Sequence, residues 1–139
     1  MFEEHFLPLL KLLLSATLAL PIAWHRETNT RIVGLRTFPL VAVGACAYLL
    51  IGLEVFGHDS EANARLLQGL MTGIGFVGGG AILKHNDHVS GTASAASIWV
   101  TGAIGASVAY ELYTYSILLA AVNFSVVAIL SRFKTDGSQ

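Results

Sequence analysis

The sequence predicts an all-α protein, a polytopic transmembrane bundle of about five helices. Five apolar stretches fill most of the 139 residues, only 12% of the residues are charged, and the mean hydropathy is +0.65. Soluble domains carry ~25% charged residues, and their helices are apolar on one face only. The alternative, a compact soluble helical protein, is disfavoured because such uniformly apolar stretches would have no side facing water.

Each stretch is close to the ~20 residues that a helix needs to cross the hydrocarbon core of a bilayer. In chain order they are His5–Ala23, Thr37–Val55, Leu66–Leu83, Thr92–Tyr110 and Tyr115–Ser131. We therefore expect one transmembrane domain over residues 1–139. The first stretch could instead be a cleaved signal peptide, but Glu3 and Glu4 precede it, where a signal peptide carries positive charge.

The positive charges alternate from loop to loop. The first and third loops and the C-terminal tail carry six Lys or Arg residues, whereas the second and fourth loops carry one. The six are Arg26, Arg31, Arg36, Lys84, Arg132 and Lys134, and the one is Arg65. The positive-inside rule then predicts an outer N-terminus and a cytoplasmic C-terminus. Lys11, in the first helix, is expected to extend its amine outward to the interface.

The third stretch is rich in glycine. Small residues let transmembrane helices approach closely, so these glycines predict a tightly packed helix. They are Gly69, Gly73, Gly75, Gly78, Gly79 and Gly80. Residues 73–78 also match the pattern GxGxxG of dinucleotide-binding proteins. This pattern indicates nucleotide binding only where a strand precedes it, and no strand is expected here. A local break, with carbonyls exposed to a cavity, is the other interpretation of the glycine run at residues 78–80.

The fourth stretch is rich in small and hydroxyl residues. Ser94, Ser97 and Thr101 share one helix face, and Gly102 and Gly105 share another. The hydroxyl face could pack against a neighbouring helix or, together with the single Asn123 of the fifth stretch, form a polar pathway for an ion or water. We expect the third and fourth helices to form the contact core, with Gly73 against Gly102 or Gly105.

A charged cluster is predicted at the cytoplasmic surface, formed by Arg26, Glu27, Arg36 and Thr37. Arginines at helix ends commonly anchor a helix at the lipid headgroups. Alternatively, the cluster is a contact site in which Arg36 holds Glu27, a phosphate or a carboxylate of a partner.

No residue pattern predicts catalysis. The serines have no His and Asp partners in sequence, so we do not expect an enzyme. His85 and His88 are too few for a firm metal site, and the acidic second loop is expected to be solvated, so no metal or cofactor is predicted. A net charge of −1 gives no basic surface for nucleic acid.

Three ordered motifs resemble the bacterial MgtC/SapB membrane family. They are His25-Arg26-Glu27 with the segment 33–37, the segment 73–83, and the segment 89–105. The resemblance covers roughly residues 7–130, the membrane domain of the family. His25 stands where the family usually has an acid. Many members continue into a soluble cytoplasmic α/β domain, so we expect a short form with the membrane domain only.

The resemblance implies a multi-pass protein of the bacterial inner membrane that is tied to magnesium homeostasis or membrane energetics. In one hypothesis it regulates another inner-membrane protein through helix–helix contacts, surrounded by membrane lipid and most readily as a homodimer. In the other it is a small oligomeric transporter or channel for Mg²⁺ or another small ion. Cation carriers place ionisable residues in mid-membrane, and their absence from the middle of the last three stretches favours the regulator.

Overall fold

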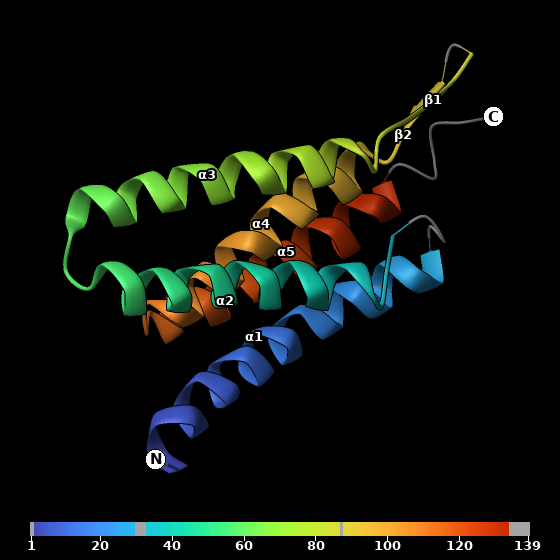
Figure 1. Cartoon of the computed structure of the whole chain (residues 1–139). Helices are drawn as coiled ribbons and strands as arrows, with labels where there is room; N and C mark the ends of the chain where they lie inside the picture. The colour runs from blue at the N-terminus through green and yellow to red at the C-terminus, as the bar shows by residue number, and fades with distance from the viewer. Residues whose placement is uncertain (1, 30–32, 87, 134–139) are drawn as a thin grey trace.

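The computed structural model describes residues 2–29, 33–86 and 88–133, which form five helices and one short hairpin. In chain order the elements are α1 (Phe2–Asn29), α2 (Thr37–Phe56), α3 (Ser60–Gly79), β1 (Leu83–His85), β2 (His88–Ser90), α4 (Thr92–Ala109) and α5 (Tyr113–Phe133). Consecutive helices run in alternating directions, and the hairpin projects beyond one end of the bundle (Figure 1). The predicted helical bundle is confirmed, whereas the hairpin was not expected.

Four of the helices within the described residues are long and apolar enough to cross a membrane, namely α1, α2, α4 and α5. The third predicted span does not meet this criterion. Its helix begins at Ser60 and ends at Gly79, so it includes the polar residues Glu61 and Arg65 and loses the last apolar residues of the predicted stretch. Even so, α3 runs beside α2 over much of its length (Figure 1).

Local chemistry explains both ends of α3. The Asp59 carboxylate accepts hydrogen bonds from the N–H groups of Glu61 at 3.0 Å and Ala62 at 3.1 Å, which caps the first turn. The glycine run ends the helix rather than breaking it in the middle. Gly91 then joins the hairpin to α4 with φ +85°, and a Cβ there would collide with the Ala81 carbonyl, so only glycine fits this turn.

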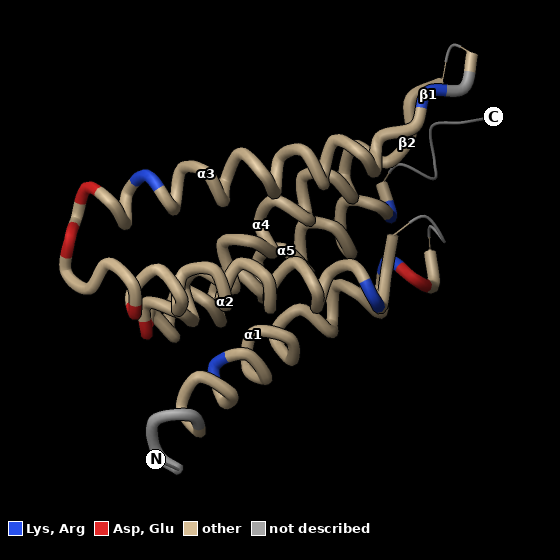
Figure 2. Tube along the Cα trace, viewed as in Figure 1, with Lys and Arg blue, Asp and Glu red and all other residues tan. Residues whose placement is uncertain are grey.

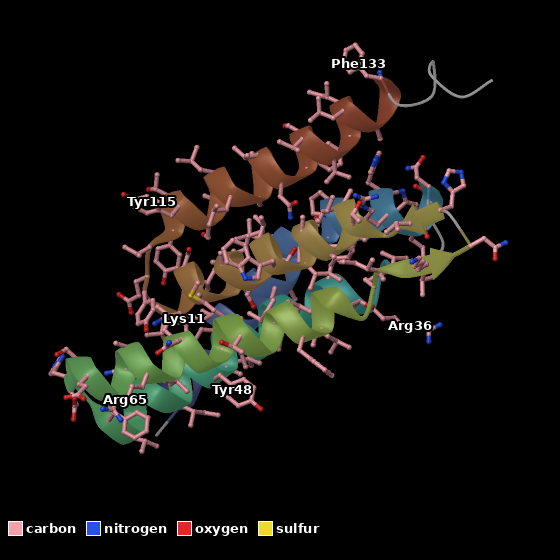
Figure 3. All side chains as sticks on the ribbon, turned by 90° about the horizontal axis from the view of Figure 1, so that it is seen from above. Lys11, Arg36, Tyr48, Arg65, Tyr115 and Phe133 are labelled. Atoms are coloured by element: carbon pink, nitrogen blue, oxygen red, sulfur yellow. The ribbon has the colours of Figure 1, made fainter. Side chains whose placement is uncertain are left out.

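The centre of the bundle is α4, which contacts all four other helices. Seen at right angles to Figure 1, α4 lies between α5 on one side and α2 and α3 on the other (Figure 3). Gly105 permits the closest approach, because a Cβ there would lie 2.9 Å from the Ala42 carbonyl carbon of α2. On the α3 side, Gly78 approaches the Ala95 carbonyl, with 3.0 Å between that oxygen and a Cβ built at Gly78.

The expectation that the third and fourth helices form the contact core is wrong for α3. Gly102 of α4 does meet the Ile74 side chain of α3, but α3 packs mainly through its larger apolar residues, including Leu67 and Leu70. Most of its glycines are not packed against another part of the described chain. A Cβ added to any of these has nothing within 4 Å inside the chain: Gly69, Gly73, Gly75 and Gly79.

Charges gather at the two ends of the bundle (Figure 2). We call one the basic end, defined by Arg26, Arg36, Lys84 and Arg132, which lie at the end of α1, before α2, in β1 and at the end of α5. We call the other the acidic end, defined by Glu54, Asp59, Glu61 and Glu111, which lie at the end of α2, at the start of α3 and between α4 and α5. The loops that are rich in Lys and Arg therefore lie together at one end of the bundle. The positive-inside rule predicts that this basic end faces the cytoplasm.

A reporter fused to the C-terminus tests this orientation. We expect a reporter that works only in the cytoplasm to be active, because α5, the last described element, ends at the basic end. Activity of a periplasm-dependent reporter at the same position would show that the bundle is inserted the other way.

Two glycine-to-alanine substitutions test the packing. Gly105→Ala should destabilise the protein by ~1–3 kcal/mol, because the new methyl group overpacks against Ala42. Gly75→Ala is the matched control. Its methyl group meets nothing, and alanine favours a helix over glycine by ~1 kcal/mol. Thermal unfolding in detergent measures both, and equal effects of the two variants would contradict the central position of α4.

Candidate functional site

The predicted hydroxyl face of α4 meets Asn123 of α5. The Ser97 hydroxyl donates to Asn123 Oδ1 at 2.7 Å, and Asn123 Nδ2 donates to the Ser97 carbonyl and to Thr101 Oγ1, both at 3.3 Å. Thr101 also donates to the Ser97 carbonyl at 2.8 Å. All three residues are buried, so these groups satisfy one another between the two helices.

Ser94 lies one turn before this network and is also buried. It lines a cavity at the basic end together with Ser97, Asn123 and Arg26. The structure thus brings the four predicted polar residues to one interface, with Ser94 on the cavity side and Thr101 deepest in the bundle.

The predicted charged cluster is divided in the structure. Arg26 is buried, with 7% of its surface exposed, whereas Arg36 is exposed and points away from the bundle (Figure 3). Glu27 Oε2 accepts a hydrogen bond from the Leu35 N–H at 3.1 Å. Gly34 makes this contact feasible, because a Cβ there would lie 2.8 Å from the Glu27 Cα.

The pairing of Glu27 with Arg36, one of the alternatives for this cluster, is not found in the described part of the chain, where Glu27 closes the turn between α1 and α2. Thr37, the last predicted member of the cluster, begins α2 and lines a different surface. Arg31, in the same loop, lies outside the described residues.

Sequence reasoning missed an ion pair at the acidic end. Lys11 Nζ donates to Glu111 Oε1 at 2.8 Å, and it lies 3.4 Å from the Ala109 carbonyl, to which it also donates. Only 9% of the Lys11 side chain is exposed, and its amine reaches the Glu111 carboxylate, whose side chain is 60% exposed, in the loop at the acidic end. The hydrogen bond and the positive charge of Lys11 lower the pKa of Glu111. The sequence offered two signals for this ion pair: a lone lysine in an apolar helix, and a lone glutamate in the loop between α4 and α5.

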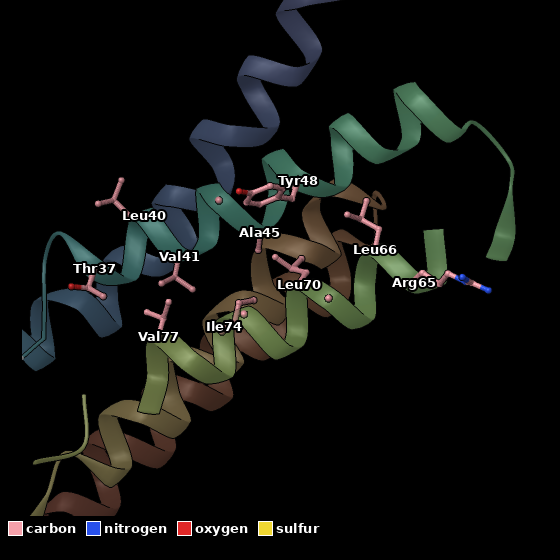
Figure 4. Close-up of a pocket in the computed structure, with 13 residues that line it drawn as sticks. Thr37, Leu40, Val41, Ala45, Tyr48, Arg65, Leu66, Leu70, Ile74 and Val77 are labelled. Carbon is pink, nitrogen blue, oxygen red and sulfur yellow. The ribbon is translucent and has the colours of Figure 1, made fainter. Parts of the chain in front are cut away.

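An apolar groove of about 750 Å³ separates α2 from α3 (Figure 4). Val41 of α2 and Leu70 and Ile74 of α3 line it, and Thr37 and Arg65 mark its two ends. Three glycines also form its walls: Gly44, Gly69 and Gly73. A Cβ added to any of these three glycines would meet nothing within 4 Å, which makes the groove a candidate surface for another helix.

Metal-binding groups do not converge in the described part of the chain. No three His, Cys, Asp or Glu side chains there could hold one ion together. The His85 side chain, one half of the histidine pair considered above, is outside the described residues.

Comparison with known proteins places the chain in a family. The MgtC family model matches residues 12–135, almost the whole chain. The protein belongs to the MgtC family. The family and the four long apolar helices together make it a multi-pass membrane protein.

Several MgtC family relatives are similar in sequence. SrpB of Synechococcus elongatus is 32% identical over 136 residues, which cover 89% of this chain and 73% of SrpB. MgtC of Brucella abortus is 33% identical over 109 residues, 78% of this chain and 45% of that protein. YhiD of Escherichia coli K12, named as a candidate magnesium transporter, is 28% identical over 130 residues, 89% of this chain and 60% of YhiD.

The chain therefore spans about half of two of these relatives and most of the third. No solved structure matches it.

The Lys11–Glu111 pair predicts a pH dependence of stability. The folded-state pKa of Glu111 lies below its ordinary value of 4.5. The stabilising contribution of the pair is therefore complete above that ordinary pKa and is lost as the pH falls through the lowered one. The melting temperature should drop more steeply at acidic pH in the wild type than in Glu111→Gln. The same slope in both proteins would show that the pair does not contribute.

Proposed function

We propose that this protein regulates another protein of the bacterial inner membrane by binding one of its transmembrane helices in the α2–α3 groove. The proposal needs no chemical step, and it rests on one observation. The glycines Gly69 and Gly73 have no contact inside the chain and line an open apolar groove. In lipid, such small residues gain energy only when another helix backbone approaches them.

The dimensions of the groove suit a helix. From Thr37 to Tyr48, α2 lines it for ~16 Å at 1.5 Å per residue, which is three helical turns. The walls are apolar along this length, with Arg65 at the acidic end and Thr37 at the basic end. Arg36, exposed beside Thr37, would meet a carboxylate or phosphate next to the docked helix.

The family supplies the physiological setting. Magnesium appears in the name of YhiD, a relative that shares 28% identity with this chain. We therefore propose that the helix contact serves magnesium homeostasis or membrane energetics. Because the chain spans 45–60% of MgtC and YhiD, the activity of those whole proteins is part of the proposal.

Transport of a small ion is the second candidate, and one observation favours it. The cavity at the basic end reaches Ser97 and Asn123, deep between α4 and α5. Beyond them the bundle is filled by Ile104 and Val108, which are fully buried, and the polar groups bond to one another. A continuous path would require these helices to separate, so the regulator is the simpler proposal.

A pair of leucine substitutions tests the groove. Gly73→Leu should leave the protein level unchanged, because an added Cβ at Gly73 meets nothing in the chain, but it should abolish function by filling the groove. Gly75→Leu is the matched control, since Gly75 is equally open and does not line the groove. Growth in low-magnesium medium, with the membrane protein quantified, is the measurement. Equal growth of the two variants would contradict the proposal.

Purified protein in liposomes separates the two candidates. We expect no Mg²⁺ flux above that of empty liposomes. Flux that is lost in Ser97→Val would instead favour a transporter. The groove could also hold a second copy of this chain. If cross-linking in cells yields a homodimer that Gly73→Leu abolishes, the regulated partner must bind elsewhere, and the assignment of the groove to a foreign helix is wrong.

A further inference from the structure

A second cavity lies at the basic end, between α4, α5 and the last turn of α1. It measures about 810 Å³, within the ~300–1,000 Å³ of small-ligand sites. Arg26, Ser94 and Asn123 give it a polar wall, and Val122, Val126 and Leu130 of α5 give it an apolar one. It is separate from the α2–α3 groove, with which it shares no lining residue.

Arg26 supplies a positive charge inside this cavity. It lies in the last turn of α1, and its side chain lines the cavity while only 7% of the residue is exposed. A guanidinium is charged at any physiological pH and presents five N–H donors in a planar fork that matches a phosphate. This fork gives the cavity a wall whose charge and shape match an anionic headgroup.

The start of α4 adds donors to the same cavity. The N-cap residue is Gly91, which provides no side chain to cap the first turn, and the residues from Gly91 to Ser94 line the cavity. The first N–H groups of a helix lack intrahelical acceptors, and the helix dipole favours negative charge there.

The apolar wall distinguishes a lipid from a free anion. Val122, Val126 and Leu130 recur every four residues along one face of α5 and are 57%, 49% and 59% exposed. An acyl chain lying along this face would cover them. Inorganic phosphate would use the polar wall only and leave the apolar wall open.

We infer that this cavity binds one anionic phospholipid, with its phosphate between Arg26 and the start of α4 and an acyl chain along α5. The surrounding charges support the assignment, because Arg36 precedes α2 and Arg132 lies in the last turn of α5 at this end of the bundle. A bound lipid would join α1, α4 and α5 at the membrane surface.

The test uses the full-length protein in detergent, with phosphatidylglycerol, phosphatidylcholine or inorganic phosphate added. Thermal unfolding and native mass spectrometry report binding. We expect phosphatidylglycerol to raise the melting temperature and to remain bound as one molecule, while the other two have no effect. Arg26→Gln should weaken phosphatidylglycerol binding about tenfold or more, the factor that ~1.4 kcal/mol represents.

Two further variants keep the test decisive if Arg26→Gln folds poorly. Ala96→Phe fills the cavity from an exposed position of α4 and should also abolish the effect. Lys84→Gln removes a charge from the same end without touching the cavity and should bind like the wild type. The site would be overturned if phosphatidylcholine stabilised the protein as much as phosphatidylglycerol does. It would also be overturned if Lys84→Gln weakened phosphatidylglycerol binding as much as Arg26→Gln does. Equal stabilisation by inorganic phosphate would overturn its assignment to a lipid.

Discussion

The close approach of α2 to α4 at Gly105 is the constraint on which the rest of the bundle depends. A side chain at this position would collide with the Ala42 backbone, so the two helices can touch only because the residue is glycine. Dispersion between closely packed surfaces is the main attraction between helices in lipid, where the hydrophobic effect does not act. This contact places α4 at the centre, and the other helices are arranged around it.

Polar contacts hold α5 and α1 against α4 at two levels. Asn123 ties α5 to Ser97 and Thr101 in the interior, and Lys11 ties α1 to the turn after α4 at the acidic end. Both arrangements place polar groups where water is scarce, so leaving them unpaired would be costly. Because each group has its partner, the same residues that could form a pathway for an ion instead close the bundle. Two of the surfaces that stay open in the described part of the chain are the α2–α3 groove and the cavity at the basic end.

Much of the bundle follows from local sequence patterns, and the rest depends on distant contacts. Long apolar stretches separated by charged loops predict the helices of this fold, and four of them meet the length and hydropathy of a membrane span. The spacing of Ser97 and Thr101 correctly places both on one face, and the lone Asn123 meets that face. The start of α3 was predicted too late, because Asp59 caps a helix whose first turns are polar.

The density of glycines in a helix predicts helix packing less well. It shows that another backbone can approach the helix, but it does not show which helix makes the approach. Gly105 meets α2, whereas Gly73 meets nothing inside the chain, although both lie in similar sequence surroundings. The pair of Lys11 and Glu111 joins residues 100 positions apart, and no local pattern reveals it. The division of Arg26 from Arg36 likewise results from the turn in which Glu27 accepts from Leu35.

Amide hydrogen exchange of the protein in lipid nanodiscs measures the central position of α4 most directly. Exchange follows local opening, which is rarest where contacts are densest. We expect the slowest exchange in α4, between Ser97 and Val108, and faster exchange in the first half of α3, from Ser60 to Gly69. Protection of α3 equal to or greater than that of α4 would contradict a bundle built around α4.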